Sequence, residues 1–152
     1  MQWIDEQLYE QVIHMKNEQA GQFIEDNAGM LINPETAFSE YMRHTIRAKK
    51  KTFQDVFLQA DISERYGYKL ISQEKHTKQR DVILRLCYAA EFTLEETQEA
   101  LCLYEMPVLF VRNPRDAILM IAFSDRPGSV IDLNEYLQKN KVSPLRSCGA
   151  MD

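Results

Sequence analysis

The sequence has little glycine and little proline, five of each in 152 residues, and its three cysteines form no C-x-x-C pair. So few helix breakers exclude a linker-rich or disordered chain. An odd number of cysteines without metal-ligand spacing excludes a disulfide framework and is typical of a cytoplasmic protein. The first residues, MQWIDEQLYEQ, are acidic and have no continuous apolar run, so we expect no secretory signal peptide.

Long apolar runs are also missing. The longest, AILMIAF at 117–123 and MPVLFV at 106–111, are far shorter than the roughly 20 residues that a membrane helix needs. We therefore expect a single compact cytoplasmic protein that does not enter a membrane.

Sequence patterns of common enzyme sites are absent. No glycine-rich phosphate loop, G-x-S-x-G or H-E-x-x-H occurs, and the three histidines lie in three different predicted elements. The acids Glu95, Glu96 and Glu99 fall in the first half of a predicted helix, where the helix dipole stabilises negative charge, so we interpret them as structural. We expect no enzymatic activity, no cofactor and no metal site.

What is present is helical periodicity. Apolar residues recur at a spacing of three to four along nearly the whole chain, which predicts an all-α protein. The first helix is predicted at about 4–18, and Asn33 with Pro34 predicts a helix at 34–50. Thr93, followed by Glu96, forms a capping-box pattern. Further helices are predicted to begin after Thr52, Ser63, Asn113 and Ser129.

The apolar faces of these helices predict the core. The residues expected to be buried are Phe38, Ile46, Val56, Leu70, Ile83, Leu86 and Leu101. The nearly unbroken apolar stretch 117–123 is predicted to be buried on most sides and to form the centre of the C-terminal half. Arg112 and Arg115 at its start either bind an anion or pair with nearby acids.

Charge is distributed in blocks. The net charge is −5 at pH 7, but residues 41–80 hold ten Lys and Arg against four acids. Residues 1–40 hold eight acids and one lysine, and residues 81–152 hold eleven acids and seven bases. A basic block therefore lies between two acidic flanks.

The middle of the chain resembles a known family. Within residues 38–104, a long helix, a short helix, a three-residue turn, a short helix and two more helices follow in the order typical of the lambda-repressor/Cro (XRE) type of helix-turn-helix domain. The matching positions are Thr52, Val56, Ile62, Ser63, Leu70 and Ile71. The stretch 38–145 is further similar to small bacterial regulator-like proteins.

Four residues differ from the family pattern. Phe57 stands where the family has a small residue, and Gly67 stands where it has an apolar residue inside the third helix. Asp61 stands in the turn where glycine is usual, although Asp tolerates the left-handed conformation better than most residues. Gln73 stands where glycine often ends the third helix.

The resemblance implies a fold and a division of the chain. The fold is a five-helix lambda-repressor-like core with an extra N-terminal helical segment and two C-terminal helices. The segments are an acidic N-terminal segment (1–33), a helix-turn-helix domain (34–104), a C-terminal helical extension packed on the same core (105–145) and a tail (146–152).

The resemblance also implies a DNA-binding surface, with a recognition helix at about 63–73. Base edges would be contacted from Glu64, Arg65, Tyr68, Lys69 and Ser72. Phosphates would be contacted from Lys49, Lys50, Lys51, Lys75, Lys78 and Arg80.

Two functions therefore stay open. The first is a DNA-binding transcriptional regulator whose C-terminal helices either support the fold or form a homodimer. The second is an interaction or inhibitor protein that uses the same scaffold to bind a protein partner, which the acidic flanks and the four departures favour.

The acidic segment 1–33 likewise has two interpretations. It either packs on the domain and lowers the electrostatic potential around the basic face, or it completes the core without approaching that face.

Overall fold

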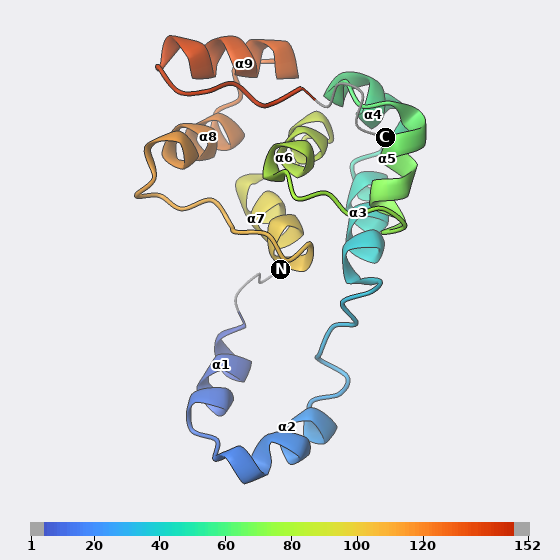
Figure 1. The fold of residues 1–152 in the computed structure, drawn as a ribbon, viewed down its shortest axis with the longest axis vertical. Coiled ribbons are helices and arrows are strands. Elements are labelled where there is room, and N and C mark those ends of the chain that lie inside the picture. The colour runs from blue at the N-terminus through green and yellow to red at the C-terminus, as the bar shows by residue number, and fades with distance from the viewer. Residues whose placement is uncertain (1–4, 148–152) are drawn as a thin grey trace.

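The computed structural model describes residues 5–147, and within them the chain forms nine α-helices, one 3-10 helix and no β-strand (Figure 1). The prediction of an all-α protein is therefore confirmed. In chain order the elements are α1 (Glu6–Ile13), η1 (Asn17–Gln19), α2 (Ala20–Asp26), α3 (Ala37–Ala48), α4 (Phe53–Ala60), α5 (Glu64–Ile71), α6 (Arg80–Ala89), α7 (Leu94–Leu103), α8 (Pro114–Ser124) and α9 (Val130–Lys139).

Local capping decides where most of these helices begin. The hydroxyls of Thr52 and Ser63 accept hydrogen bonds from backbone N–H groups in the first turns of α4 and α5. Thr93 and Glu96 form the predicted capping box of α7. Each of these side chains satisfies a backbone donor that the helix leaves without a partner, and the predicted starts after them are confirmed.

The predicted start of the helix at 34 is wrong. The Asn33 carboxamide oxygen accepts from Glu35 N at 3.0 Å, and the Asn33 carbonyl accepts from Thr36 N and Ala37 N. Asn33 therefore closes a turn rather than capping the helix, and α3 begins at Ala37. The predicted first helix at 4–18 is also too long, because α1 ends at Ile13 and a separate short helix follows.

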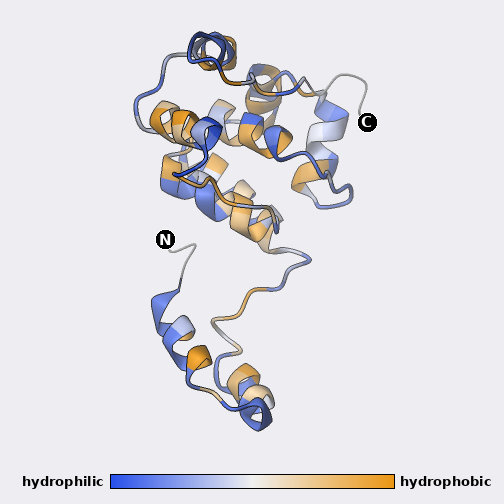
Figure 2. Cartoon of the chain, turned by 60° about the vertical axis from the view of Figure 1, so that its left-hand side comes forward, coloured by the Kyte–Doolittle hydropathy of each residue, from blue (hydrophilic) through white to orange (hydrophobic). Residues whose placement is uncertain are grey.

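The first two helices form an N-terminal hairpin, residues 5–32, that projects from the rest of the molecule (Figures 1 and 2). Its two arms meet where the Asn27 amide donates to the Gln11 side chain at 3.2 Å. In the described part of the segment, no hydrogen bond or ion pair joins it to the basic face. The structure thus differs from both interpretations of the segment, since the hairpin neither covers that face nor completes the core.

The remaining helices surround one hydrophobic core around α6. The seven side chains that we predicted to be buried are at most 1% exposed, which confirms them. Almost every residue of α6 is buried, because α4, α7 and α9 all pack against it. Core residues run from Phe38 in α3 to Leu145 beyond α9, so the C-terminal helices share the core with α3–α7.

The prediction for 117–123 is confirmed only in part: of the seven residues three are buried, three are half-buried and one is exposed. In α8, Leu119 and Phe123 face the core, but Ile121 is 52% exposed. The helix enclosed on most sides is α6, although its composition is more polar than that of α8. An apolar run shows that a helix contains buried positions, but only the packing decides how many of its sides are covered.

Two of the four departures compensate each other where α4 crosses α5. A Cβ atom on Gly67 would lie 2.5 Å from the Phe57 ring, so the absence of a side chain at 67 makes room for the large one at 57. The large residue is at position 57 and the small one at position 67, the reverse of the family pattern, so the two helices still pack closely.

The turn between α4 and α5 also keeps a regular geometry. Asp61 adopts the left-handed conformation (φ 57°, ψ 49°), and Ile62 N donates to the Phe57 carbonyl at 3.0 Å. This is the hydrogen-bond pattern with which helices commonly end at a glycine. Asp61 therefore replaces the usual glycine without changing the path of the chain.

The C-terminal segment is tied to the core by buried charged groups. The guanidinium of Arg85, which is 5% exposed, donates to the carbonyls of Ala60, Leu145 and Arg146. Arg115 and Asp81 form a two-pronged ion pair at 3.0 Å. Of the two readings of Arg115, the ion pair is therefore the one observed.

Candidate nucleic-acid interface

Helix α5, the predicted recognition helix, has one buried and one outward side. Tyr66, Gly67, Leu70 and Ile71 face the core, so the residues between them face outward. Arg65 is exposed in the first turn, and its side chain makes no hydrogen bond or ion pair with the described residues. The guanidinium at the start of α5 is therefore available to a ligand.

The starts of α4 and α5 are linked by their side chains. The Gln54 amide donates to the Glu64 carboxylate at 3.2 Å, and both side chains are exposed. The bond fixes the orientation of the Glu64 carboxylate beside Arg65. The two helix ends consequently present one continuous polar surface.

Aromatic side chains form the floor of this surface between α3, α4 and α5. The Tyr68 ring lies edge-on to Phe57 and Phe53, with centroids 5.1 and 6.0 Å apart. The Arg43 guanidinium lies 5.9 Å from the centre of the Phe53 ring. Tyr68, Phe53 and Arg43, together with Arg47, line a cleft of about 260 Å³, which we call the α3–α5 cleft.

Four more of the predicted contact residues make no ion pair within the described residues. Lys50 and Lys78 are exposed, while Lys69 is half-buried on α5. Tyr68, which lines the cleft, is 41% exposed. Lys75 also has no acid partner among the described residues, and its ammonium group lies 5.9 Å from the centre of the Tyr66 ring.

Three predicted phosphate contacts are held by acids of the same chain. Lys49 lies 2.7 Å from the Glu96 carboxylate, and Lys51 lies 2.6 Å from that of Glu91. The hydrogen bond from Lys51 lowers the pKa of the Glu91 carboxyl. Burial raises the pKa of Glu96, but the hydrogen bonds from Lys49 and Thr93 and the charge of Lys49 together outweigh it, so the pKa is lowered.

The third of these residues, Arg80, is held more firmly than the two lysines. Its guanidinium makes two hydrogen bonds to Asp116, the shorter at 2.5 Å, and also donates to the carbonyls of Pro107 and Val108. Arg80 thus joins α6 to the start of α8. Lys49, Lys51 and Arg80 are therefore structural ties.

Ser72 has a structural role as well. It follows the last residue of α5, and its hydroxyl donates to the Lys69 carbonyl at 3.2 Å and accepts weakly from Glu74 N. A hydroxyl that closes the end of a helix is poorly placed to read a base.

Sequence reasoning missed Arg43 and Arg47. They are four residues apart on α3, so both lie on one face, and both are exposed at the α3–α5 cleft. The spacing was visible in the sequence. What was not visible is that this face of α3 borders the predicted recognition surface.

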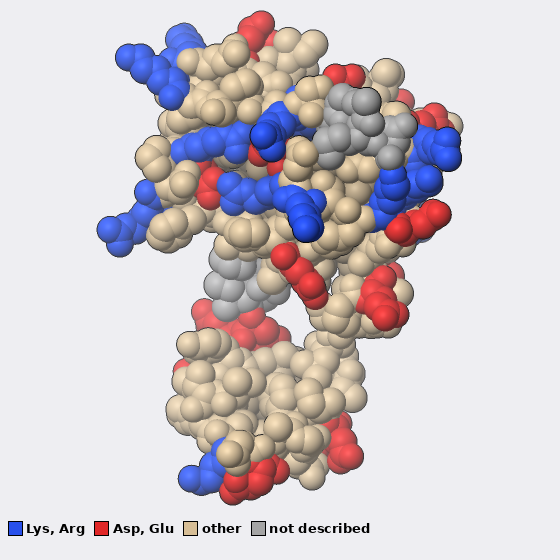
Figure 3. Space-filling model, viewed as in Figure 1, with Lys and Arg blue, Asp and Glu red and all other residues tan. Residues whose placement is uncertain are grey.

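The space-filling view shows how these charges are distributed. Lys and Arg gather on the upper body, and Asp and Glu are frequent on the N-terminal hairpin (Figure 3). The first acidic block is thus separated in space from the basic region, whereas acids of the later helices lie on the same body as the Lys and Arg side chains.

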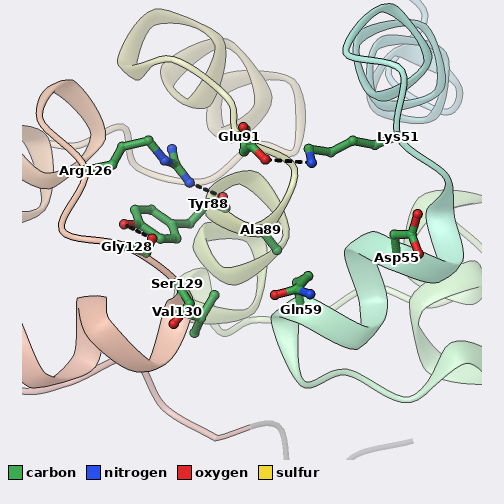
Figure 4. Close-up of a pocket in the computed structure, with 10 residues that line it drawn as sticks. All are labelled: Lys51, Asp55, Gln59, Tyr88, Ala89, Glu91, Arg126, Gly128, Ser129 and Val130. Carbon is green, nitrogen blue, oxygen red and sulfur yellow. Dashed lines mark hydrogen bonds and ion pairs between the residues drawn. The ribbon is translucent and has the colours of Figure 1, made fainter.

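A cavity of about 540 Å³ lies between α4, α6 and the α8–α9 connection (Figure 4). Arg126 lies 3.8 Å above the centre of the Tyr88 ring and donates to the carbonyls of Tyr88 and Phe92. The Tyr88 hydroxyl donates to the Gly128 carbonyl at 2.8 Å. Lys51, the other cation of this cavity, is held by Glu91. Arg126 therefore serves the packing of the α8–α9 connection on α6, and Lys51 joins the α3–α4 connection to the residues that follow α6.

Within residues 5–147, no three His, Cys, Asp or Glu side chains are grouped closely enough to hold a metal ion. None of the helices described there is both long and apolar enough to cross a membrane.

Comparisons of the chain with protein-family models, with curated proteins and with solved structures find no match. What the chain binds is therefore inferred from its own surface.

Proposed function

We propose that this protein is a non-enzymatic DNA-binding regulator of the lambda-repressor-like helix-turn-helix type, with α5 as its recognition helix. The observation that carries the proposal is the pairing of α4 and α5 through the left-handed turn at Asp61, with Arg65 free at the start of α5. A short helix presented in this way fits the major groove, where its N-terminal residues meet base edges.

Base recognition would start from Arg65. Its guanidinium suits the paired acceptors of guanine, and Lys69, one turn further along α5, reaches a base or a phosphate. Glu64, held by Gln54, is suited to accept from the amino group of cytosine.

Phosphate contacts would come from cations that have no acid partner. Arg43 and Arg47 flank α5 on one side, and Lys50 follows the end of α3. Lys75 and Lys78 lie in the connection that follows α5. These residues position the helix on the duplex without reading its sequence.

A specific observation favours the second function, binding of a protein partner. The α3–α5 cleft has a floor of aromatic rings, and Leu58 on α4 is 76% exposed. Partly exposed aromatic and aliphatic side chains beside arginines are typical of protein interfaces.

Salt-titrated binding to a duplex of random sequence separates the two functions. The logarithm of the binding constant should fall linearly with the logarithm of the salt concentration, and Arg43→Gln/Arg47→Gln should reduce the slope by about two. Lys139→Gln, which removes an exposed charge on α9, is the matched control and should leave the slope unchanged. If the unmodified protein binds no duplex even at low salt, the protein-partner function replaces this proposal.

A further inference from the structure

The N-terminal hairpin exposes several large apolar side chains. Helices α1 and α2 have eight and seven residues, which is too short for stability in water without a packing partner. Six large side chains of this segment are nevertheless 50–62% exposed: Tyr9, Val12, Ile13, Ile24, Met30 and Ile32. Such a concentration of exposed apolar side chains indicates a contact surface.

One face of α1 combines this apolar character with negative charge. Glu6, Tyr9, Glu10 and Ile13 follow each other at positions i, i+3, i+4 and i+7, so they share one side of the helix, and all four are exposed. Neither carboxylate has a salt-bridge partner within the described residues. This face suits a partner that is basic and partly aromatic.

The α3–α5 cleft has that chemistry. Arg43 and Arg47 are four residues apart on α3, as Glu6 and Glu10 are on α1, and Phe53 with Tyr68 provides the apolar floor. The volume of about 260 Å³ is suited to one aromatic side chain. Because the two acids and the two arginines have the same spacing, each carboxylate can lie opposite one guanidinium while the aromatic side chain between them occupies the cleft.

The connection to α3 directs the hairpin away from this cleft in its own chain. The Gln73 amide donates to the Pro34 carbonyl at 3.1 Å, and its oxygen accepts from Ser39 N at 3.0 Å. The chain is thus attached to the body from Pro34 onward, and the hairpin extends beyond the start of α3 (Figures 1 and 2). A contact between the hairpin and an α3–α5 cleft would therefore require a second molecule.

We propose that two copies of this chain form a two-fold dimer in which each N-terminal hairpin occupies the α3–α5 cleft of the other copy. Tyr9 enters the cleft, and Glu6 and Glu10 lie opposite Arg43 and Arg47. The two contacts are identical by symmetry, and once one forms, the second becomes intramolecular and is favoured by a high effective concentration.

The dimer would cover arginines that flank α5. Only this consequence rests on the proposed DNA-binding function: DNA and the hairpin would compete for Arg43 and Arg47, so dilution and salt would release the surface. Dimerisation itself does not require DNA.

Reciprocal charge reversal tests the dimer without DNA. Sedimentation of the unmodified protein should show a dimer that dissociates on dilution. The hairpin variant Glu6→Arg/Glu10→Arg and the cleft variant Arg43→Glu/Arg47→Glu should each be monomeric alone, because like charges then face each other. An equimolar mixture of the two should regain the dimer, since both contacts again join opposite charges. Glu135→Arg on α9 is the matched control and should dimerise like the unmodified protein.

Three results would overturn the proposal: an unmodified protein that is monomeric at all concentrations, a hairpin variant that dimerises alone, or a mixture that stays monomeric while circular dichroism shows both variants folded. Tyr9→Ala gives a second measurement. Removing the aromatic anchor should raise the dimer dissociation constant about tenfold or more, whereas Ile131→Ala, which truncates a side chain that is 71% exposed on α9, should not. Failure to bind duplex DNA would leave these results unchanged, so the two proposals fail separately.

Discussion

Replacing Gly67 by alanine should destabilise the protein, although alanine is the better helix former. Gly67 lies within α5, where alanine instead of glycine would ordinarily add about 1 kcal/mol of stability. Here the new methyl group would lie 2.5 Å from two Phe57 ring carbons and 2.7 Å from a third. Phe57 has little room to move, because the Phe53 and Tyr68 rings lie against it with centroids 6.2 and 5.1 Å away.

The magnitude follows from these opposing effects. Overpacking of a core typically costs about 1–3 kcal/mol. Subtracting the helix-propensity gain leaves a net loss of about 0–2 kcal/mol for Gly67→Ala. In a Phe57→Ala background the clash is gone, so the same change should instead stabilise by about 1 kcal/mol.

Urea unfolding followed by circular dichroism measures this cycle of four proteins. The expected result is a coupling energy of about 1–3 kcal/mol between positions 57 and 67, with the sign of the Gly67→Ala effect reversing between backgrounds. If Gly67→Ala stabilises both backgrounds equally, Phe57 does not fill the space above Gly67 and the account of this helix crossing is incorrect.

Three further tests address other parts of the fold. Leu86→Ala, at a fully buried position of α6, should cost about 2–5 kcal/mol in urea unfolding, and a loss below about half a kcal/mol would contradict its placement. Lys141→Gly should stabilise the protein by about 0.5–1 kcal/mol, because Lys141 has φ 62°, a left-handed conformation that glycine adopts without strain. Gln73 has a similar φ of 64°, but Gln73→Gly should not stabilise, because it removes the two hydrogen bonds of the Gln73 side chain. Burial raises the pKa of Asp81, but hydrogen bonds from Arg115 and from the backbone of the C-terminal segment outweigh it, so the pKa is lower in the folded protein. The ionised Asp81 carboxylate therefore stabilises the fold, and this contribution is lost as the pH falls below about 4. Asp81→Asn should therefore lower stability at neutral pH and flatten the decline in acid, and an unchanged acid profile would show that this pair does not contribute.

Local signals in the sequence were sufficient to predict where most of the helices begin. The hydroxyls of Thr52, Ser63 and Thr93 act on backbone groups within three residues, so their patterns can be read without tertiary information. Asn33 has the same chemistry but closes a turn, because its oxygen bonds to Glu35 N two residues on. A capping residue therefore predicts a turn or a helix start in its neighbourhood more reliably than it predicts the residue at which the helix begins.

The candidate site depends on contacts between distant parts of the chain. Lys49, Lys51 and Arg80 are as basic in sequence as Arg65, but their acid partners are 47, 40 and 36 residues further along the chain. The exposed face of α8 could not be predicted for the same reason, because composition does not specify which sides of a helix its neighbours cover. Charge along the sequence therefore located the basic region but did not separate cations without an acid partner from those paired within the chain.

The proposed recognition by α5 is tested most directly by comparing Arg65→Ala and Lys50→Ala on a duplex selected from a random library and on an unselected duplex. Arg65→Ala should weaken binding to the selected duplex by about 1–3 kcal/mol and leave binding to the unselected one nearly unchanged, because Arg65 reads a base. Lys50→Ala should weaken both duplexes to the same extent and flatten the salt dependence, because Lys50 meets only phosphates. Equal effects of Arg65→Ala on both duplexes, or no salt-dependent binding by the unmodified protein, would contradict the assignment of α5 as the recognition helix.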